Sequence, residues 1–107
     1  MRPIVLIFAK IPASAMAIFP FILLKEASYK TNKRLINHER IHLRQQLELL
    51  VLPFYALYLL HYLFNLIRYR NHHRAYLNIV FEKEAYACDD NLDYLTQRRF
   101  FSWLKFC

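Results

Sequence analysis

Two histidines and a glutamate lie within five consecutive residues, in the segment His38-Glu39-Arg40-Ile41-His42. Histidines four positions apart lie on one face of a helix, about 5–6 Å apart at Cβ, so their ring nitrogens can bind one metal ion. Glu39 lies about 100° further round the helix, where its carboxylate can reach a water bound to that ion. The pattern therefore predicts a Zn²⁺ site with His38 and His42 as ligands and Glu39 as the catalytic base.

A catalytic zinc ion needs a third protein ligand and keeps its fourth position for water. The remaining candidates in this chain are His61, His72, His73, Glu82 and Glu84. His72 and His73 adjoin an arginine cluster, which favours a turn or a basic patch facing lipid over metal ligation.

The histidine motif, followed by the segment Glu84-Ala85-Tyr86-Ala87-Cys88, resembles the gluzincin metallopeptidases over about residues 31 to 95. The resemblance implies hydrolysis of peptide bonds by zinc-activated water, with a third ligand from a downstream helix that carries a glutamate. In that family an aspartate or asparagine usually follows this glutamate by four positions and supports a zinc-bound histidine. Counted from Glu84, that position is Cys88 here, and Asp89 is the next residue.

Helical phase distinguishes the two glutamates. Glu84 shares a side of the helix with the apolar seam that we expect to be buried, formed by Cys88, Leu92 and Leu95. Glu82 shares a side with Asp89 and Asp93, which is typical of a solvent-facing surface. Because a ligand must face the other helix, Glu84 is the preferred third ligand and Glu82 is the alternate.

The elements that position these residues predict a mainly α (α+β) fold. Residues 1–27 hold short apolar runs punctuated by prolines, which predict a β-hairpin of two strands joined near Pro12. Thr31 or Asn32 can cap a helix over 31–52 that carries the histidines. An apolar helix over 53–69 and a glutamate helix over 74–97 follow. Because 107 residues suffice for one modest core, we expect a single zincin-like domain over 1–107.

The composition predicts association with a membrane. Hydrophobic residues make up 57% of the chain, more than its core needs, and the formal net charge of +7 favours anionic lipid headgroups. The stretch from Leu49 to Ile67 is almost wholly apolar. A single crossing there would leave His42 and Glu84 on opposite sides of the bilayer, so we expect the stretch to bend back, with Pro53 as the place where a helix ends or kinks. The expected location is the inner (cytoplasmic) membrane.

Other classes of function are excluded or disfavoured. The chain has no glycine, which excludes the phosphate-binding loops of nucleotide-binding folds and the nucleophile elbow of serine hydrolases. Its aromatic residues fall inside apolar runs, so we expect no nucleic acid partner. The leading hypothesis is a membrane-associated zinc metallopeptidase acting on a peptide or protein substrate. The alternative is a catalytically inactive zinc-binding membrane module that docks a partner or acts as a sensor, which the small size and Cys88 favour; a third is a basic membrane protein without a metal.

Overall fold

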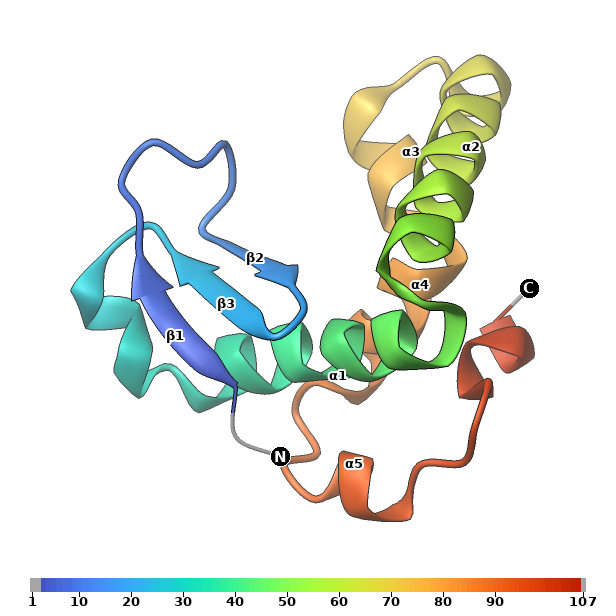
Figure 1. The fold of residues 1–107 in the computed structure, drawn as a ribbon. Helices are drawn as coiled ribbons and strands as arrows, with labels where there is room; N and C mark the ends of the chain where they lie inside the picture. The colour runs from blue at the N-terminus through green and yellow to red at the C-terminus, as the bar shows by residue number, and fades with distance from the viewer. Residues whose placement is uncertain (1–2, 107) are drawn as a thin grey trace.

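Three short strands form a small sheet in the computed structural model, which describes residues 3–106 (Figure 1). The strand order is β1 (Ile4–Ile7), β3 (Phe21–Leu24), β2 (Ala15–Ile18), with β1 parallel and β2 antiparallel to β3. The expectation of two strands joined near Pro12 was wrong, because the connection through Pro12 crosses to the far edge of the sheet. The hairpin is β2–β3. Pro20 lacks an amide hydrogen and divides the apolar run of residues 14 to 24 into these two strands.

The histidine motif lies on α1 (Lys33–Leu49), which follows the 3₁₀ helix η1 (Ala27–Thr31). The side chain of Asn32 caps α1 by accepting a hydrogen bond from the Leu35 amide at 3.1 Å. The helix ends at Leu49 instead of residue 52, because Leu50 adopts a positive φ of 66°. Pro53 therefore does not break the helix. It lies in the first turn of α2, where its missing amide hydrogen has no helical partner to lose.

The apolar helix α2 (Val51–Tyr69) and the short helix α3 (His72–Leu77) form a returning pair (Figure 1). Arg70 adopts the left-handed conformation that ends α2, and Asn65 of α2 donates a hydrogen bond to the Ala75 carbonyl of α3 at 3.2 Å. Among the described residues, α2 is the one helix that is long and apolar enough to cross a membrane, by length and composition only.

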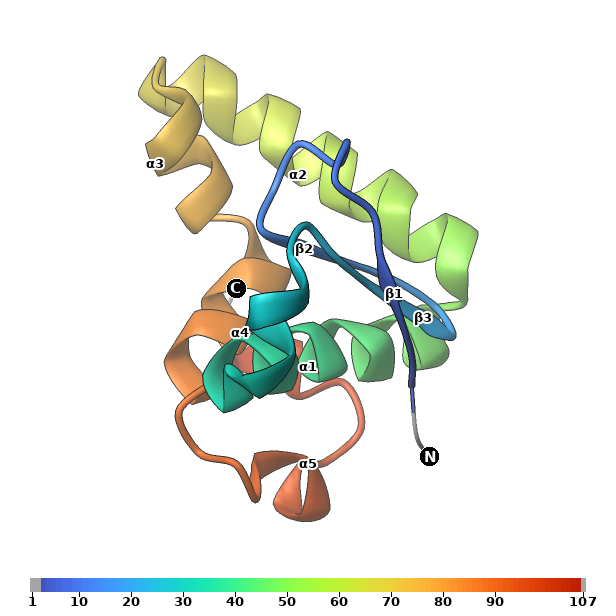
Figure 2. The same ribbon diagram turned by 90° about the vertical axis from the view of Figure 1, so that its left-hand side faces the viewer.

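The expected glutamate helix over 74–97 is divided into α3, α4 (Val80–Cys88) and α5 (Tyr94–Gln97), with the 3₁₀ helix η2 (Ser102–Phe106) after them. Ile79 has an extended backbone, with φ −65° and ψ 130°, and this redirects the chain between α3 and α4. As a result α4 lies alongside α1, as two perpendicular views show (Figures 1 and 2).

Two apolar clusters hold these elements together. The first packs the sheet on α1 and contains Ala17, Ile22, Leu24 and Leu43. The second joins α2 to the start of α4 and contains Phe54, Ile79, Val80 and Phe81. The fold is thus mainly α with a small sheet, as the sequence predicted.

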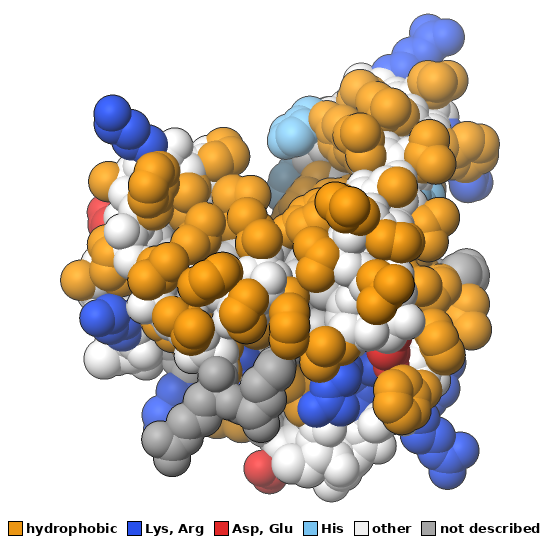
Figure 3. All heavy atoms as spheres, viewed as in Figure 1, with side chains coloured by type: hydrophobic (Ala, Val, Ile, Leu, Met, Phe, Trp, Pro, Cys, Tyr) orange, Lys and Arg blue, Asp and Glu red, His pale blue; other side chains and the backbone are white. Residues whose placement is uncertain are grey.

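Large apolar side chains also cover part of the surface. Figure 3 shows them spread over the sheet and along α2 on one face of the molecule. On α2 the exposed set comprises Leu52, Leu57, Leu59, Leu60, Leu63, Phe64 and Ile67, and β1 and its flank add Ile4, Leu6, Ile7 and Phe8. We call these two groups together the apolar face.

Candidate metal centre

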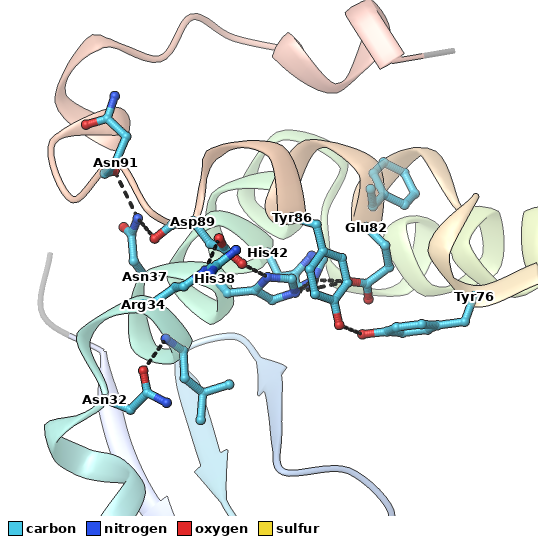
Figure 4. A network of polar contacts seen from close by, with 12 residues as sticks. Asn32, Arg34, Asn37, His38, His42, Tyr76, Glu82, Tyr86, Asp89 and Asn91 are labelled. Carbon is cyan, nitrogen blue, oxygen red and sulfur yellow. Dashed lines mark hydrogen bonds and ion pairs between the residues drawn. The ribbon is translucent and has the colours of Figure 1, made fainter. Parts of the chain in front are cut away.

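His38 and His42 of α1 face Glu82 of α4 where the two helices pack together (Figure 4). Nε2 of His38 and Nε2 of His42 each lie 3.0 Å from the same carboxylate oxygen, Oε1 of Glu82. The two Nε2 atoms are 3.2 Å apart, and all three side chains are buried. The structure thus brings the two predicted histidine ligands together with Glu82.

The other nitrogen of each imidazole contacts an oxygen acceptor. Nδ1 of His38 lies 2.9 Å from Oδ2 of Asp89, and Nδ1 of His42 lies 2.8 Å from Oε1 of Gln45. A carboxylate and an amide oxygen only accept hydrogen bonds, so each Nδ1 must carry the hydrogen. The lone pair of each Nε2 is then free and directed toward Glu82. Such outer contacts fix the orientation of metal-binding histidines.

The orientation of the Gln45 amide follows from its other contacts. Its nitrogen donates to the Phe81 carbonyl at 3.1 Å and to Oε1 of Glu84 at 2.9 Å. Both of these partners are acceptors, so the amide nitrogen must face them and the amide oxygen must face His42.

Three atoms that can each accept a hydrogen bond therefore converge on one point, where either a shared proton or a metal cation can satisfy them. In a tetrahedral zinc site with bonds of about 2.0–2.1 Å, the donor atoms are about 3.3 Å apart. The separations of 3.0 and 3.2 Å between the atoms of His38, His42 and Glu82 are close to that edge. This buried group can hold a metal ion.

The charges of the group favour a positive charge next to Glu82. Burial disfavours the charged imidazole of His42, but the Glu82 carboxylate outweighs it and raises the pKa of His42 to about 9. Burial alone would raise the pKa of Glu82, but His42 and His38 hold it well below its usual range. Tyr58 donates a hydrogen bond to Oε2 of Glu82 at 2.5 Å. Glu82 is thus a carboxylate with Oε1 directed at the histidines.

Glu84, the preferred third ligand from helical phase, points to a different part of the protein. Its carboxylate accepts hydrogen bonds from Tyr94 and Arg98, each at 2.5 Å, and from Gln45. Arg98 also binds Glu48 of α1, at 2.7 Å. The phase argument failed because both faces of α4 are buried, one against α1 and the other under the C-terminal segment, so burial does not select a ligand.

No protein-family model, curated protein or solved structure matches this chain. The candidate metal centre is therefore described from its own side chains alone.

Asp89 makes the supporting contact with His38 that the resemblance placed at Cys88. Arg34 holds the other carboxylate oxygen of Asp89 at 2.7 Å. Asp89 follows Glu82 by seven residues, two helical turns, and this spacing was a signal in the sequence for pairing Asp89 with Glu82. Gln45 and Tyr58 had no comparable signal.

The three other histidines lie outside the donor group. His61 accepts a hydrogen bond from the Val80 amide at 3.1 Å and so caps the start of α4. His72 contacts the Tyr62 hydroxyl at 2.7 Å, and both His72 and His73 line the cleft that opens beside the centre.

Glu39 borders this cleft next to the donor group. It lines both a larger part of about 520 Å³ and a smaller part of about 190 Å³. Burial raises the pKa of its carboxyl group, and His42 and His38 partly offset that rise. The carboxylate oxygens of Glu39 are not among the side-chain atoms that are both sealed from solvent and without a hydrogen-bond partner. Among the described residues, Nε1 of Trp103 is the one such atom. No described group donates to Glu39, so its carboxylate reaches the cleft.

Proposed function

We propose that this chain is a minimal zinc metallopeptidase of the gluzincin type, associated with a membrane. The convergence of three buried acceptor atoms on one point, with a carboxylate of raised pKa beside it at a cleft, carries the proposal. Two imidazoles and one carboxylate at tetrahedral separations are a ligand set of catalytic zinc. When bound, zinc lowers the pKa of a water to about 7 and polarises a carbonyl group.

Glu39 is the group that moves the proton. A general base works best when its pKa lies near the working pH, and burial moves the pKa of Glu39 upward in that direction. In the proposed reaction Glu39 accepts a proton from the attacking water and later delivers it to the leaving amine nitrogen. His38 and His42 do not do this in the proposed reaction, because their Nε2 atoms would hold the zinc ion and their Nδ1 hydrogens are bound to Asp89 and Gln45.

The open edge of β2 offers the backbone groups that would align a peptide. The Ser14 carbonyl pairs with the Lys25 amide of the neighbouring chain segment, whereas the Ala17 carbonyl accepts from Gln46 on the opposite side. Successive residues of a strand direct their backbone groups to alternate sides, so the N–H and C=O of Ala15 also face away from β3. Ala15 lines both parts of the cleft. An extended peptide can therefore add to this edge beside Glu39.

Asp89 also bears on the choice between an active enzyme and an inactive module. The inactive module was favoured because Cys88 stood where a supporting carboxylate was expected. Asp89 supplies that carboxylate to His38 at 2.9 Å, which supports the peptidase.

The apolar face supports membrane association. Its exposed leucine, isoleucine and phenylalanine side chains are of the kind that mark a contact with a membrane or a partner. Arg68, Arg70 and Arg74 cluster at the far end of α2, where they can meet anionic headgroups. Because α3 and α4 return to the centre, a crossing by α2 would draw the charged residues of α4 toward the bilayer. We infer that α2 lies along the interface.

The test is the exchange Glu39→Gln, which keeps the shape of the side chain and removes the proton acceptor. Wild-type protein loaded with Zn²⁺ should cleave members of a broad library of fluorogenic peptides, and the variant should retain its zinc but lose at least about 10²-fold in rate. Zinc content is measured on both proteins by elemental analysis. The peptidase proposal fails if the wild type cleaves nothing, or if the variant cleaves as fast as the wild type.

A further inference from the structure

The cleft continues on both sides of Glu39, and its two parts differ in chemistry. They share a wall formed by Ala13, Ala15, Glu39 and Tyr76. Glu39 thus lies at the junction, where the scissile bond of a bound peptide would be. Side chains before and after that bond would enter different parts.

The smaller part is mainly apolar away from the centre. Beside His42 and Glu82 of the centre it is lined by Pro12, Met16, Phe54, Tyr55 and Tyr58. Gln46 closes the strand edge at this end, because its amide nitrogen donates to the Ala17 carbonyl at 2.8 Å and its amide oxygen accepts from the Phe19 amide at 2.7 Å. A peptide paired with β2 must end or turn away at Gln46.

The larger part is open and rich in hydrogen-bond donors, from Asn32, Arg34, His72 and His73. Arg34 uses Nε to hold Asp89, and its two terminal nitrogens have no partner among the described residues. The side-chain oxygen of Asn32 caps α1, which leaves its amide nitrogen available. A guanidinium edge and an amide nitrogen that line the same cleft as two imidazoles are suited to a carboxylate.

The strand β2 connects the two parts. Ser14, just before it, lines the larger part alone, Ala15 lines both parts, and Met16 and Ala17 line the smaller part alone. A single extended peptide along this edge therefore reaches both the donor-rich end and the apolar end.

We propose that the cleft selects peptides that carry a carboxylate on the Arg34 side of the scissile bond and an apolar side chain on the other side. The carboxylate is that of an acidic side chain or of the peptide C-terminus. This inference rests on the proposed function, of which it names the substrate class.

The experiment uses the full chain with Glu39→Gln, loaded with Zn²⁺, so that binding is measured without cleavage. The probes are fluorescein-labelled decapeptides with one leucine in an alanine and serine background, in which a single glutamate is placed at each position in turn. Each peptide is made with a free and with an amidated C-terminus, and each glutamate is also replaced by glutamine. We expect one glutamate position, on one side of the leucine, to bind about tenfold more tightly than its glutamine counterpart, the size of one charge-assisted hydrogen bond. If the terminal carboxylate is the group bound, amidation should weaken binding by the same factor.

Arg34→Gln should remove this preference, whereas Arg40→Gln should keep it. Arg40 lies on the same helix, is exposed and loses the same charge, but does not line either part of the cleft. Zinc content is measured for both variants, and if Arg34→Gln loses zinc, His73→Ala provides the second test at the same end. The inference is overturned by equal binding at every glutamate position, by an equal loss in Arg40→Gln, or by no binding of any peptide. A wild type that binds with the expected preference but cleaves nothing would reject the peptidase and retain the cleft assignment.

Discussion

Replacing each carboxylate of α4 by its amide separates metal binding from folding. Glu82 contacts both Nε2 atoms of the histidines at 3.0 Å, whereas Glu84 binds Arg98 and Tyr94 on the other side of the helix. Both side chains are buried, and the two positions are two residues apart in one helix. Glu82→Gln and Glu84→Gln are therefore matched controls for each other.

The expected effects differ in kind and in size. Glu82→Gln removes a charged donor atom from the centre, and because changes to supporting residues alone cost about 10–100-fold in metal affinity, we expect a loss of at least about 100-fold, or about 3 kcal/mol. Glu84→Gln leaves the donor group intact, so zinc affinity should change by less than about threefold. It weakens two hydrogen bonds to Arg98 from charged to neutral acceptors, which should lower the free energy of unfolding by about 1–3 kcal/mol.

Zinc affinity is measured by competition with a chromophoric chelator, and stability by urea unfolding in the presence of EDTA. A loss of zinc affinity in Glu84→Gln as large as that in Glu82→Gln would contradict the geometry described for the centre. Unchanged affinity in Glu82→Gln would remove this residue from it.

Arg98→Met should lower the free energy of unfolding by about 3–5 kcal/mol in urea titrations, because it leaves two buried carboxylates without their counter-ion. The folded state holds the pKa of Glu84 below its usual value of 4.5, so the stabilisation from this group is complete above that pH and is lost as the pH falls through the lowered pKa. The free energy of unfolding of the metal-free wild type should therefore fall more steeply from pH 7 to pH 3 than that of Glu84→Gln. Equal slopes in the two proteins would contradict this. Phe64→Glu, on the apolar face, should reduce co-sedimentation with vesicles of anionic and zwitterionic lipid, whereas Leu92→Glu, exposed outside that face, should not; equal losses would argue against docking by α2.

The part of the centre that could be predicted from the sequence is local. Two histidines four residues apart on one amphipathic helix must share a face, and the cap at Asn32 follows from its side chain. The class of fold could also be predicted, because the helical periodicity and the short apolar runs are separate along the chain.

The predictions that failed concern the strand order and the orientation of α4, which depend on tertiary packing. The strands pair as β1-β3-β2 because the chain crosses the sheet before β2, and no local pattern near Pro12 specifies that crossing. The polar side of α4 was interpreted as solvent-facing, although its Glu82 is buried against the histidines. A buried metal centre and a solvated surface place the same residue types on a helix, so periodicity alone does not distinguish them.

The contact of Arg98 with α1 and α4 determines which face of α4 the histidines meet. Arg98 binds Glu48 near the end of α1 and Glu84 in the middle of α4, with both carboxylates fully buried. Residues two apart in a helix lie about 200° apart around its axis, so fixing Glu84 toward Arg98 turns Glu82 to the opposite side. That side is where Nε2 of His38 and His42 are directed. A rotation of α4 by one residue, about 100°, would break the Arg98 contacts and remove Oε1 of Glu82 from the centre together. The buried ion pairs under the C-terminal segment thus help to orient Glu82 toward the candidate metal centre, which they do not touch.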